Sequence, residues 1–199
     1  MKKMILSTFV TLLSASAFAK SIPAGNYAID AAHSKVGFEI PHLVISTVEG
    51  RFSKFDGNIK VEEKLEKSKA TLNVDVASIS TENKDRDDHL KSGDFFDVAK
   101  FPKMTFVSKK ISGTPDALKI TGALTLKGVT KDVTLDAKYL GEVKDAYGNL
   151  KIAFSAKGKI NRKDFGLTWN SAVEAGPVVG DEVTLVLNIQ AGKPLAAKK

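Results

Sequence analysis

Hydrophobic and polar residues alternate along most of the chain with a period of two. The alternation is cleanest over residues 118–127, and a second alternating run begins at Val133, just after Gly128. A period of two predicts a strand with one apolar and one solvated face, and two such runs joined by a short glycine-containing turn predict an antiparallel hairpin. The apolar positions of this hairpin are Leu118, Ile120, Gly122, Leu124, Leu126, Val133, Leu135, Ala137 and Tyr139.

The same alternation recurs through most of the remaining chain and predicts about eight strands of roughly ten residues. Within residues 48–61 the apolar positions change parity near Ser53 and Lys54, which predicts a bulge or bend there. Consecutive hairpins leave exposed edges unless the sheet closes on itself. The expected fold class is therefore all-β, an antiparallel up-and-down barrel, with a β-sandwich as the competing architecture.

Residues 81–102 form the one long stretch without strand alternation. Asn83 predicts the N-cap of a short helix over Lys84 to Ser92, and Gly93 marks its end. Apolar residues follow in the rest of the stretch and need to be buried. We expect a short helical insert and a loop that fold over one end of the sheet.

Residues 1–19 have the organisation of a secretory signal peptide. Two lysines precede an apolar stretch from Met4 to Leu13, and Ala17-Phe18-Ala19 matches a signal-peptidase site. The apolar stretch is shorter than the about 20 residues that a membrane-spanning helix needs. We expect cleavage after Ala19, a periplasmic or secreted location, and a single domain over residues 20–199.

Composition narrows the function classes further. The chain has no cysteine, which removes disulfides, thiol catalysis and thiolate metal sites. Its net charge of +7 comes from lysines scattered on solvated positions, which is compatible with a transient membrane contact. No basic–aromatic motif predicts a nucleic-acid partner. No pattern in the sequence predicts an oligomeric state.

Enzyme motifs are also missing from the sequence. It contains neither Gly-x-Ser-x-Gly nor His-Glu-x-x-His, and its three histidines are not at metal-ligand spacing. We therefore expect no enzyme activity, no metal and no cofactor.

Small residues occupy several positions that should point into the barrel. An interior of this size is either filled by side chains or holds one slender ligand. The small residues either hollow out a tube or let the strands coil tightly without a cavity, and the pattern alone leaves both open. The residues predicted to line such a tube are Phe38, Phe52, Phe55, Phe106, Leu124, Phe154 and Trp169.

Two polar clusters are candidates for contacts at a barrel mouth. Arg86 and His89 share a helix face and suit an anionic or oxygenated head group, with Phe95 and Phe96 beside them. The alternative is structural, with Arg86 and Asp87 pinning the insert by ion pairs and His89 capping the helix. The second cluster, residues 161–166, is either a polar site or a turn with a structural ion pair.

A set of short motifs, in order along the chain, resembles the YceI-like polyisoprenoid-binding proteins. The motifs are Tyr27-x-Ile29-Asp30-x-x-His33-Ser34-x-Val36-x-Phe38, Gly50-x-Phe52-x-x-Phe55-x-Gly57, Arg86-Asp87-x-His89-Leu90-x-x-x-Asp94-Phe95-Phe96-Asp97, Phe101-Pro102-x-Met104-x-Phe106, Gly122-x-Leu124-Thr125-Leu126-x-Gly128-Val129-Thr130-Lys131 and Asp164-Phe165-Gly166-Leu167.

The resemblance implies an extended lipocalin-like barrel of eight antiparallel strands that holds an isoprenoid chain. It favours the open tube and places residues 86–97 near its opening. The implied function is a periplasmic or secreted protein that sequesters or carries an isoprenoid lipid, such as a quinone or a polyprenyl phosphate. The alternatives are a lipid-modifying enzyme that uses Arg86 and His89, and a ligand-free interaction or stress-response barrel.

Overall fold

The computed structural model describes residues 21–173 and 176–194, so the predicted signal peptide at residues 1–19 lies outside the described residues. The strands are β1 (Gly25–Ile29), β2 (Lys35–His42), β3 (Ser46–Phe52), β4 (Phe55–Val61), β5 (Lys69–Asp75), β6 (Ile79–Ser80), β7 (Lys103–Thr114), β8 (Ala117–Leu126), β9 (Val129–Lys144), β10 (Asn149–Asn161), β11 (Ala172–Val173), β12 (Gly176–Pro177) and β13 (Glu182–Pro194). The helices are α1 (Lys84–Lys91) and the 3-10 turns η1 (Ala31–His33), η2 (Leu65–Lys67), η3 (Val76–Ser78) and η4 (Arg162–Phe165).

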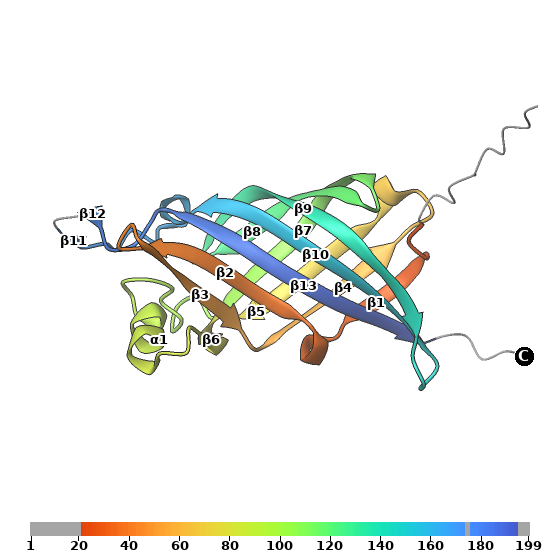
Figure 1. The fold of residues 1–199 in the computed structure, drawn as a ribbon, viewed down its shortest axis with the longest axis horizontal. Helices are drawn as coiled ribbons and strands as arrows, with labels where there is room; N and C mark the ends of the chain where they lie inside the picture. The colour runs from red at the N-terminus through yellow and green to blue at the C-terminus, as the bar shows by residue number, and fades with distance from the viewer. Residues whose placement is uncertain (1–20, 174–175, 195–199) are drawn as a thin grey trace, which may run out of the picture.

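The sheet closes into an antiparallel barrel (Figure 1). Its order is β1-β4-β5-β7-β8-β9-β10-β13, and β13 pairs back with β1. Three of these eight positions hold two short strands end to end, namely β1 with β2, β4 with β3, and β5 with β6. The second strand of each position continues the same order, because β2 also pairs with β13, β3 pairs with β2, and β6 pairs with β3. Closure leaves no free edge around the ring. The predicted eight-stranded barrel with a short helical insert is confirmed.

The predicted bend is the break between β3 and β4 at Ser53 and Lys54. Phe52 before the break and Gly57 after it are both buried, although their positions differ in parity. The break therefore turns the apolar residues of both strands toward the interior, as expected of a bulge in a curled sheet.

The predicted hairpin is formed by β8 and β9. Their pairing begins next to the turn, with Leu126 opposite Val129, and continues along both strands. Lys127 and Gly128 form the turn with φ of 48° and 76°. Positive φ at both turn residues matches the twist of the two strands, and glycine adopts it without strain. On the solvated face the hydroxyls of Thr121 and Thr134 lie 2.8 Å apart, so cross-strand pairs support the hairpin from outside.

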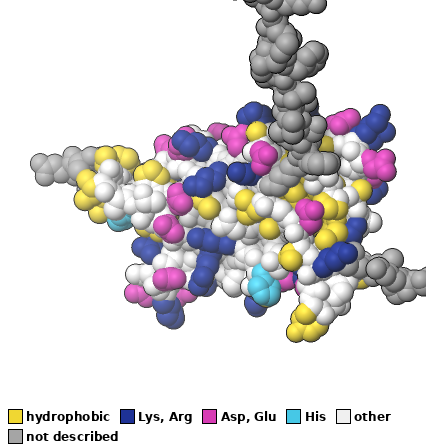
Figure 2. Space-filling view, turned by 45° about the vertical axis from the view of Figure 1, so that its right-hand side comes forward, with side chains coloured by type: hydrophobic (Ala, Val, Ile, Leu, Met, Phe, Trp, Pro, Cys, Tyr) yellow, Lys and Arg dark blue, Asp and Glu magenta, His cyan; other side chains and the backbone are white. Residues whose placement is uncertain are grey.

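Lysines on the outer face of the barrel lie among carboxylates. Figure 2 shows basic and acidic side chains interspersed on the visible face. Lys109 Nζ lies 2.5 Å from Asp132, and Lys119 Nζ lies 2.7 Å from Asp136. All four side chains are more than half exposed, so these pairs add little to stability and mainly keep the wall solvated.

The end of the barrel where β9 meets β10 is solidly packed. Tyr27, Tyr139 and Ala191 have no exposed surface there, and Ile152 is 1% exposed. The Tyr27 hydroxyl donates to the carbonyl oxygen of Pro23 at 2.9 Å, and the Tyr139 hydroxyl donates to Glu142. Burial, together with the Glu142 carboxylate, raises the pKa of both tyrosine hydroxyls, so both remain neutral donors.

β13 continues to Pro194, because residues 192–194 pair with Asn149 to Lys151 at the start of β10. The short strands β11 and β12 form a separate hairpin. Among residues 21–173 and 176–194, no helix is long and apolar enough to span a bilayer.

Candidate functional site: an apolar cavity inside the barrel

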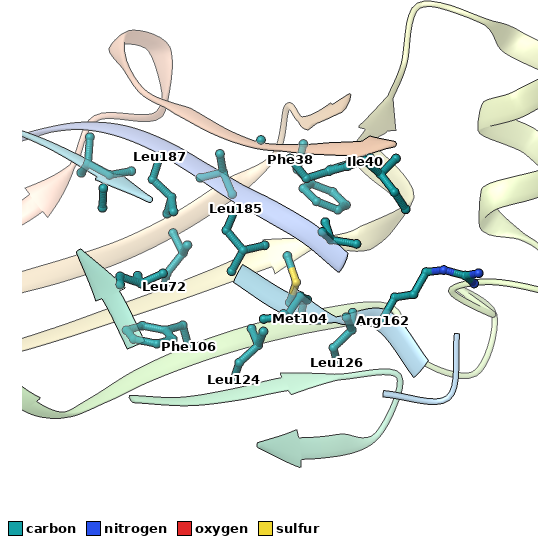
Figure 3. Close-up of a pocket in the computed structure, with 18 of the residues that line it drawn as sticks. Phe38, Ile40, Leu72, Met104, Phe106, Leu124, Leu126, Arg162, Leu185 and Leu187 are labelled. Carbon is teal, nitrogen blue, oxygen red and sulfur yellow. The ribbon is translucent and has the colours of Figure 1, made fainter. Parts of the chain in front are cut away.

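The barrel encloses a cavity of about 560 Å³ (Figure 3). Side chains from β2, β5, β7, β8 and β13 face one another across it, among them Phe38, Leu72, Phe106, Leu124 and Leu187. This volume lies in the range of about 300–1,000 Å³ that is usual for small-molecule sites. The barrel is therefore hollow.

Inward-facing glycines keep the axis clear by seating aromatic rings against the wall. A Cβ atom added to Gly50 would lie 2.2 Å from the ring of Phe38, and one added to Gly122 would lie 2.4 Å from the ring of Phe106. The rings thus occupy space on the wall that a side chain would otherwise take. Phe38 and Phe106 are only partly buried, because their free faces border the cavity.

Most of the residues predicted to line the tube lie on the cavity wall. Phe55 is the exception and corrects the sequence-based expectation: it opens β4 at the bend opposite Val74, where its side chain packs against the core cluster around Val74 and Val76. Contact of any of these residues with a ligand stays a prediction. The predicted residues on the wall are Phe38, Phe52, Phe106, Leu124, Phe154 and Trp169.

Sequence reasoning missed most of the residues on the wall. Many of the overlooked residues lie on strands whose alternation was clear, so the same inward parity would have identified them. Examples are Ile40, Val48, Leu72, Met104, Ile120, Leu185 and Leu187.

We call the end of the cavity bordered by Arg86, His89, Phe95, Phe96 and Trp169 the mouth. Helix α1 supplies the first two of these residues. Its N-cap is Asn83, as predicted, whose side chain accepts from the backbone N–H of Arg86 at 3.0 Å. A cap of this kind satisfies an otherwise unpaired N–H group and fixes where the helix begins.

Arg86 and Asp87 anchor α1 to the barrel through Thr81. Arg86 donates from Nε to Thr81 Oγ1 at 2.7 Å and from Nη2 to the Thr81 carbonyl oxygen at 2.9 Å. Asp87 accepts from the Thr81 N–H at 2.7 Å and from its hydroxyl at 2.6 Å. These contacts support the structural alternative, with hydrogen bonds to buried Thr81 taking the place of the expected ion pairs.

His89 belongs to an aromatic group at the mouth. Its ring stands edge-on to Phe95 and Trp169, with centroids 5.1 and 5.0 Å apart, and its Nε2 lies 2.9 Å from Asp94 Oδ2. The alternative in which His89 caps the helix is wrong, because Ser92 closes the helix by donating from its backbone N–H to the His89 carbonyl oxygen. The imidazole instead joins α1 to the loop that carries Phe95.

Arg162 is buried beside the cavity, with 3% of its side chain exposed. It donates from Nε to the Gly180 carbonyl oxygen, from Nη1 to those of Leu167 and Trp169, and from Nη2 to Asp181. Burial lowers the pKa of the Arg162 guanidinium, and the Asp181 carboxylate opposes that shift. Residues 161–166 therefore form a turn with a structural ion pair, and Arg162 positions the segment that carries Trp169.

The site offers binding chemistry more clearly than reaction chemistry. Among the described residues, no three histidine, aspartate or glutamate side chains gather where they could hold a metal ion. Polar groups lie at the mouth, whereas the wall between the strands is almost wholly apolar. Such a cavity suits a long apolar chain with its polar end at the mouth.

The model of the YceI-like domain matches residues 27–191. This chain belongs to the YceI-like family. The YceI proteins of Escherichia coli O157:H7 and Salmonella agona are each 40% identical to it over 194 residues, covering 96% of this chain and 97% of theirs. The resemblance noted in the motifs is confirmed.

Solved structures share the YceI-like fold. Burkholderia cenocepacia BcnA aligns with a TM-score of 0.72 and 27% identity over 81% of this chain and 98% of BcnA. The Campylobacter jejuni YceI protein aligns with a TM-score of 0.68 and 38% identity, over 83% and 96% of the two chains. A polyisoprenoid-binding domain from Saccharophagus degradans aligns with a TM-score of 0.61, over 84% and 98% of the two chains, and its 18% identity shows a common fold.

Proposed function

We propose that this YceI-like protein binds one isoprenoid lipid, a quinone or a polyprenyl phosphate, inside the barrel. The observation that carries the proposal is the cavity of about 560 Å³, whose wall is apolar between the packed end and the mouth. Each buried CH₂ group of a ligand contributes about 0.8 kcal/mol before ordering costs. A long chain therefore binds tightly with few polar contacts.

The protein acts in this proposal as a carrier or a sequestering protein and performs no reaction. The most deeply buried cation near the cavity, Arg162, already donates to four protein oxygens, and Arg86 holds Thr81. The organisation of residues 1–19 supports export with cleavage after Ala19, and in this proposal the protein binds its ligand in the periplasm or outside the cell.

Native mass spectrometry of protein purified from its own host tests the proposal. The expected result is a bound mass that organic extraction releases as an isoprenoid, in about equal amount to the protein. A ligand-free mass that stays unchanged after incubation with quinones and polyprenyl phosphates would refute it.

A matched pair of variants locates the site. Ala156 lines the cavity, whereas the side chain of the neighbouring Ser155 lies on the opposite, outer face of β10. Ala156→Trp should block uptake, and Ser155→Trp should leave it unchanged. Gly122→Phe is less suitable, because a Cβ atom there would lie 2.6 Å from the backbone oxygen of Val107 and so strain the wall itself. Equal uptake by both Trp variants would place the ligand elsewhere.

A further inference from the structure

The turn between β2 and β3 exposes large apolar side chains to solvent. Val44 is 66% exposed and Ile45 is 87% exposed, and Leu43 beside them is partly buried. Single exposed apolar residues are ordinary on protein surfaces, but consecutive ones at the tip of a hairpin are not explained by packing. These three residues, which we call the apolar tip, are the subject of the inference.

The backbone of the apolar tip favours other residue types. Leu43 and Val44 have φ of 51° and 65°, in the left-handed region. Hairpin turns with two such residues usually hold Asn-Gly or Asp-Gly, and a β-branched residue is disfavoured there. The chain therefore keeps apolar side chains at positions where its own folding would be easier with polar ones, which points to an external contact.

The apolar tip lies beside the mouth and is held in place. The Leu43 N–H donates to the Val178 carbonyl oxygen at 2.9 Å, and the Gly180 N–H donates to the Pro41 carbonyl oxygen at 2.9 Å. Pro41, Val178 and the adjacent Val179 themselves border the cavity. The tip lies at the left-hand end of the barrel, where hydrophobic side chains gather (Figures 1 and 2).

Charge around the mouth is nearly balanced. Residues 43–47 carry no charge, and α1 has three acidic and three basic side chains. Asp88 pairs with both Lys84 and Lys91, at 2.5 and 3.8 Å. A surface of this kind lacks the basic excess that attracts anionic lipids or nucleic acid, and it fits an electrically neutral surface with an apolar interior.

We propose that the apolar tip inserts into a neutral lipid bilayer and holds the barrel mouth against it. The identity of the cargo rests on the proposed function, because an isoprenoid lipid resides in a membrane and must enter the cavity from there. The docking itself rests on the exposure, the backbone conformation and the position of Leu43, Val44 and Ile45.

The test compares transfer from two sources of the same probe, an isoprenoid quinone carried in phosphatidylcholine vesicles or in detergent micelles. The variant is Val44→Asn with Ile45→Ser, which suits the left-handed backbone and leaves the cavity wall intact. The control is Val143→Asn with Tyr147→Ser in the β9–β10 hairpin at the opposite end, where these side chains are 63% and 91% exposed. All three proteins are purified by the same route, so residues 1–20 are in the same state in each.

We expect the tip variant to take up the quinone from vesicles about tenfold more slowly than the unaltered protein, and from micelles at the same rate. The control should match the unaltered protein from both sources. Flotation with empty phosphatidylcholine vesicles should show the same loss for the tip variant, with little change when anionic lipid is added. Uptake from vesicles by the tip variant at the unaltered rate would overturn the inference.

The two proposals fail separately. If the unaltered protein takes up quinone from neither source, ligand binding is refuted for that probe, and flotation with empty vesicles still decides the docking. If the unaltered protein does not float with vesicles but forms a dimer that the tip variant loses, the tip contacts a second copy and the bilayer inference is wrong.

Discussion

Replacement of Arg162 by methionine should destabilise the mouth of the barrel strongly. Methionine keeps an unbranched apolar stem but removes the charge and every donor. The change leaves the carbonyl oxygens of Gly180, Leu167 and Trp169 without the donor that they share, and leaves Asp181 without one of its cations. These groups lie in the segment after η4 and at the end of the β12–β13 connection, and Arg162 itself belongs to η4, so one side chain joins three parts of the chain.

The hydrogen bonds set the size of the expected effect. A buried acceptor that loses its donor costs about 1–3 kcal/mol. The Asp181 carboxylate is 42% exposed and keeps Lys163 as a partner, so its lost ion pair adds little. The separate costs do not add, because Gly180 and Trp169 are only partly buried and water can replace some donors. We therefore expect the loss of donors to these three carbonyl oxygens in Arg162→Met to lower the free energy of unfolding by about 3–5 kcal/mol.

Lys163→Met is the matched control for this prediction. Lys163 Nζ lies 2.8 Å from the other oxygen of Asp181, but its side chain is 47% exposed. Removal of an exposed pair should cost no more than about 1 kcal/mol. The two variants thus remove a cation from the same carboxylate and differ in burial and in the carbonyl oxygens that they leave unpaired.

Urea unfolding followed by circular dichroism measures the loss of stability in both variants. We expect the urea midpoint to shift and the slope of the unfolding free energy against urea concentration to stay unchanged. Trp169 is the only tryptophan in the chain, so its fluorescence reports on the mouth in the same experiment. Its emission should move to longer wavelength in Arg162→Met, because water reaches the indole once its backbone loses its anchor. A loss below about 1 kcal/mol, or one equal to that of Lys163→Met, would refute the reasoning.

Three further predictions concern other parts of the barrel. Gly122→Ala should lower the free energy of unfolding by about 1–3 kcal/mol, because its Cβ atom would crowd a backbone oxygen of β7, whereas Gly93→Ala, with open space around it, should change the urea midpoint little. The hydrogen bond from Lys163 holds the pKa of Asp181 below its usual range; the carboxylate should therefore stabilise the fold above the unfolded-state pKa and lose this effect as pH falls through the folded-state pKa. The difference in unfolding free energy between the unaltered protein and Asp181→Asn should accordingly shrink below about pH 4, and a constant difference from pH 7 to pH 3 would contradict the argument. Asn83→Ala removes the N-cap of α1 and should cost about 0.5–2 kcal/mol, which hydrogen exchange of the α1 amides measures, and unchanged exchange would show that tertiary contacts alone hold the helix.

Local patterns in the sequence determined the wall of the barrel. Strand alternation has a period of two because successive side chains point to opposite faces, so the inward and outward sets could be read without knowing which strands pair. The β8–β9 hairpin and the break at Ser53 and Lys54 followed from parity alone. The start of α1 followed from Asn83, because capping involves only neighbouring residues.

The tertiary structure decided whether the barrel is hollow. Small inward residues are compatible with a tight coil or a tube, and the answer depends on the partner that register places beside each one. Gly50 lies opposite Phe38, and Gly122 is diagonal to Phe106, so each glycine receives an aromatic ring that would otherwise fill the axis. No local pattern specifies such pairs, because they join residues on different strands.

The roles of the polar residues were decided in the same way. The sequence placed Arg86 and His89 in one candidate cluster and Arg162 in another. Only the folded chain brings Thr81 to Arg86, and the carbonyl oxygens of Leu167 and Gly180 to Arg162. A cation is free for a ligand only if the fold leaves its donors unpaired, and that depends on backbone groups distant in sequence. The sequence by itself thus determined which residues face inward, whereas strand register and long-range hydrogen bonds decided that the interior is open and which cations hold its mouth together.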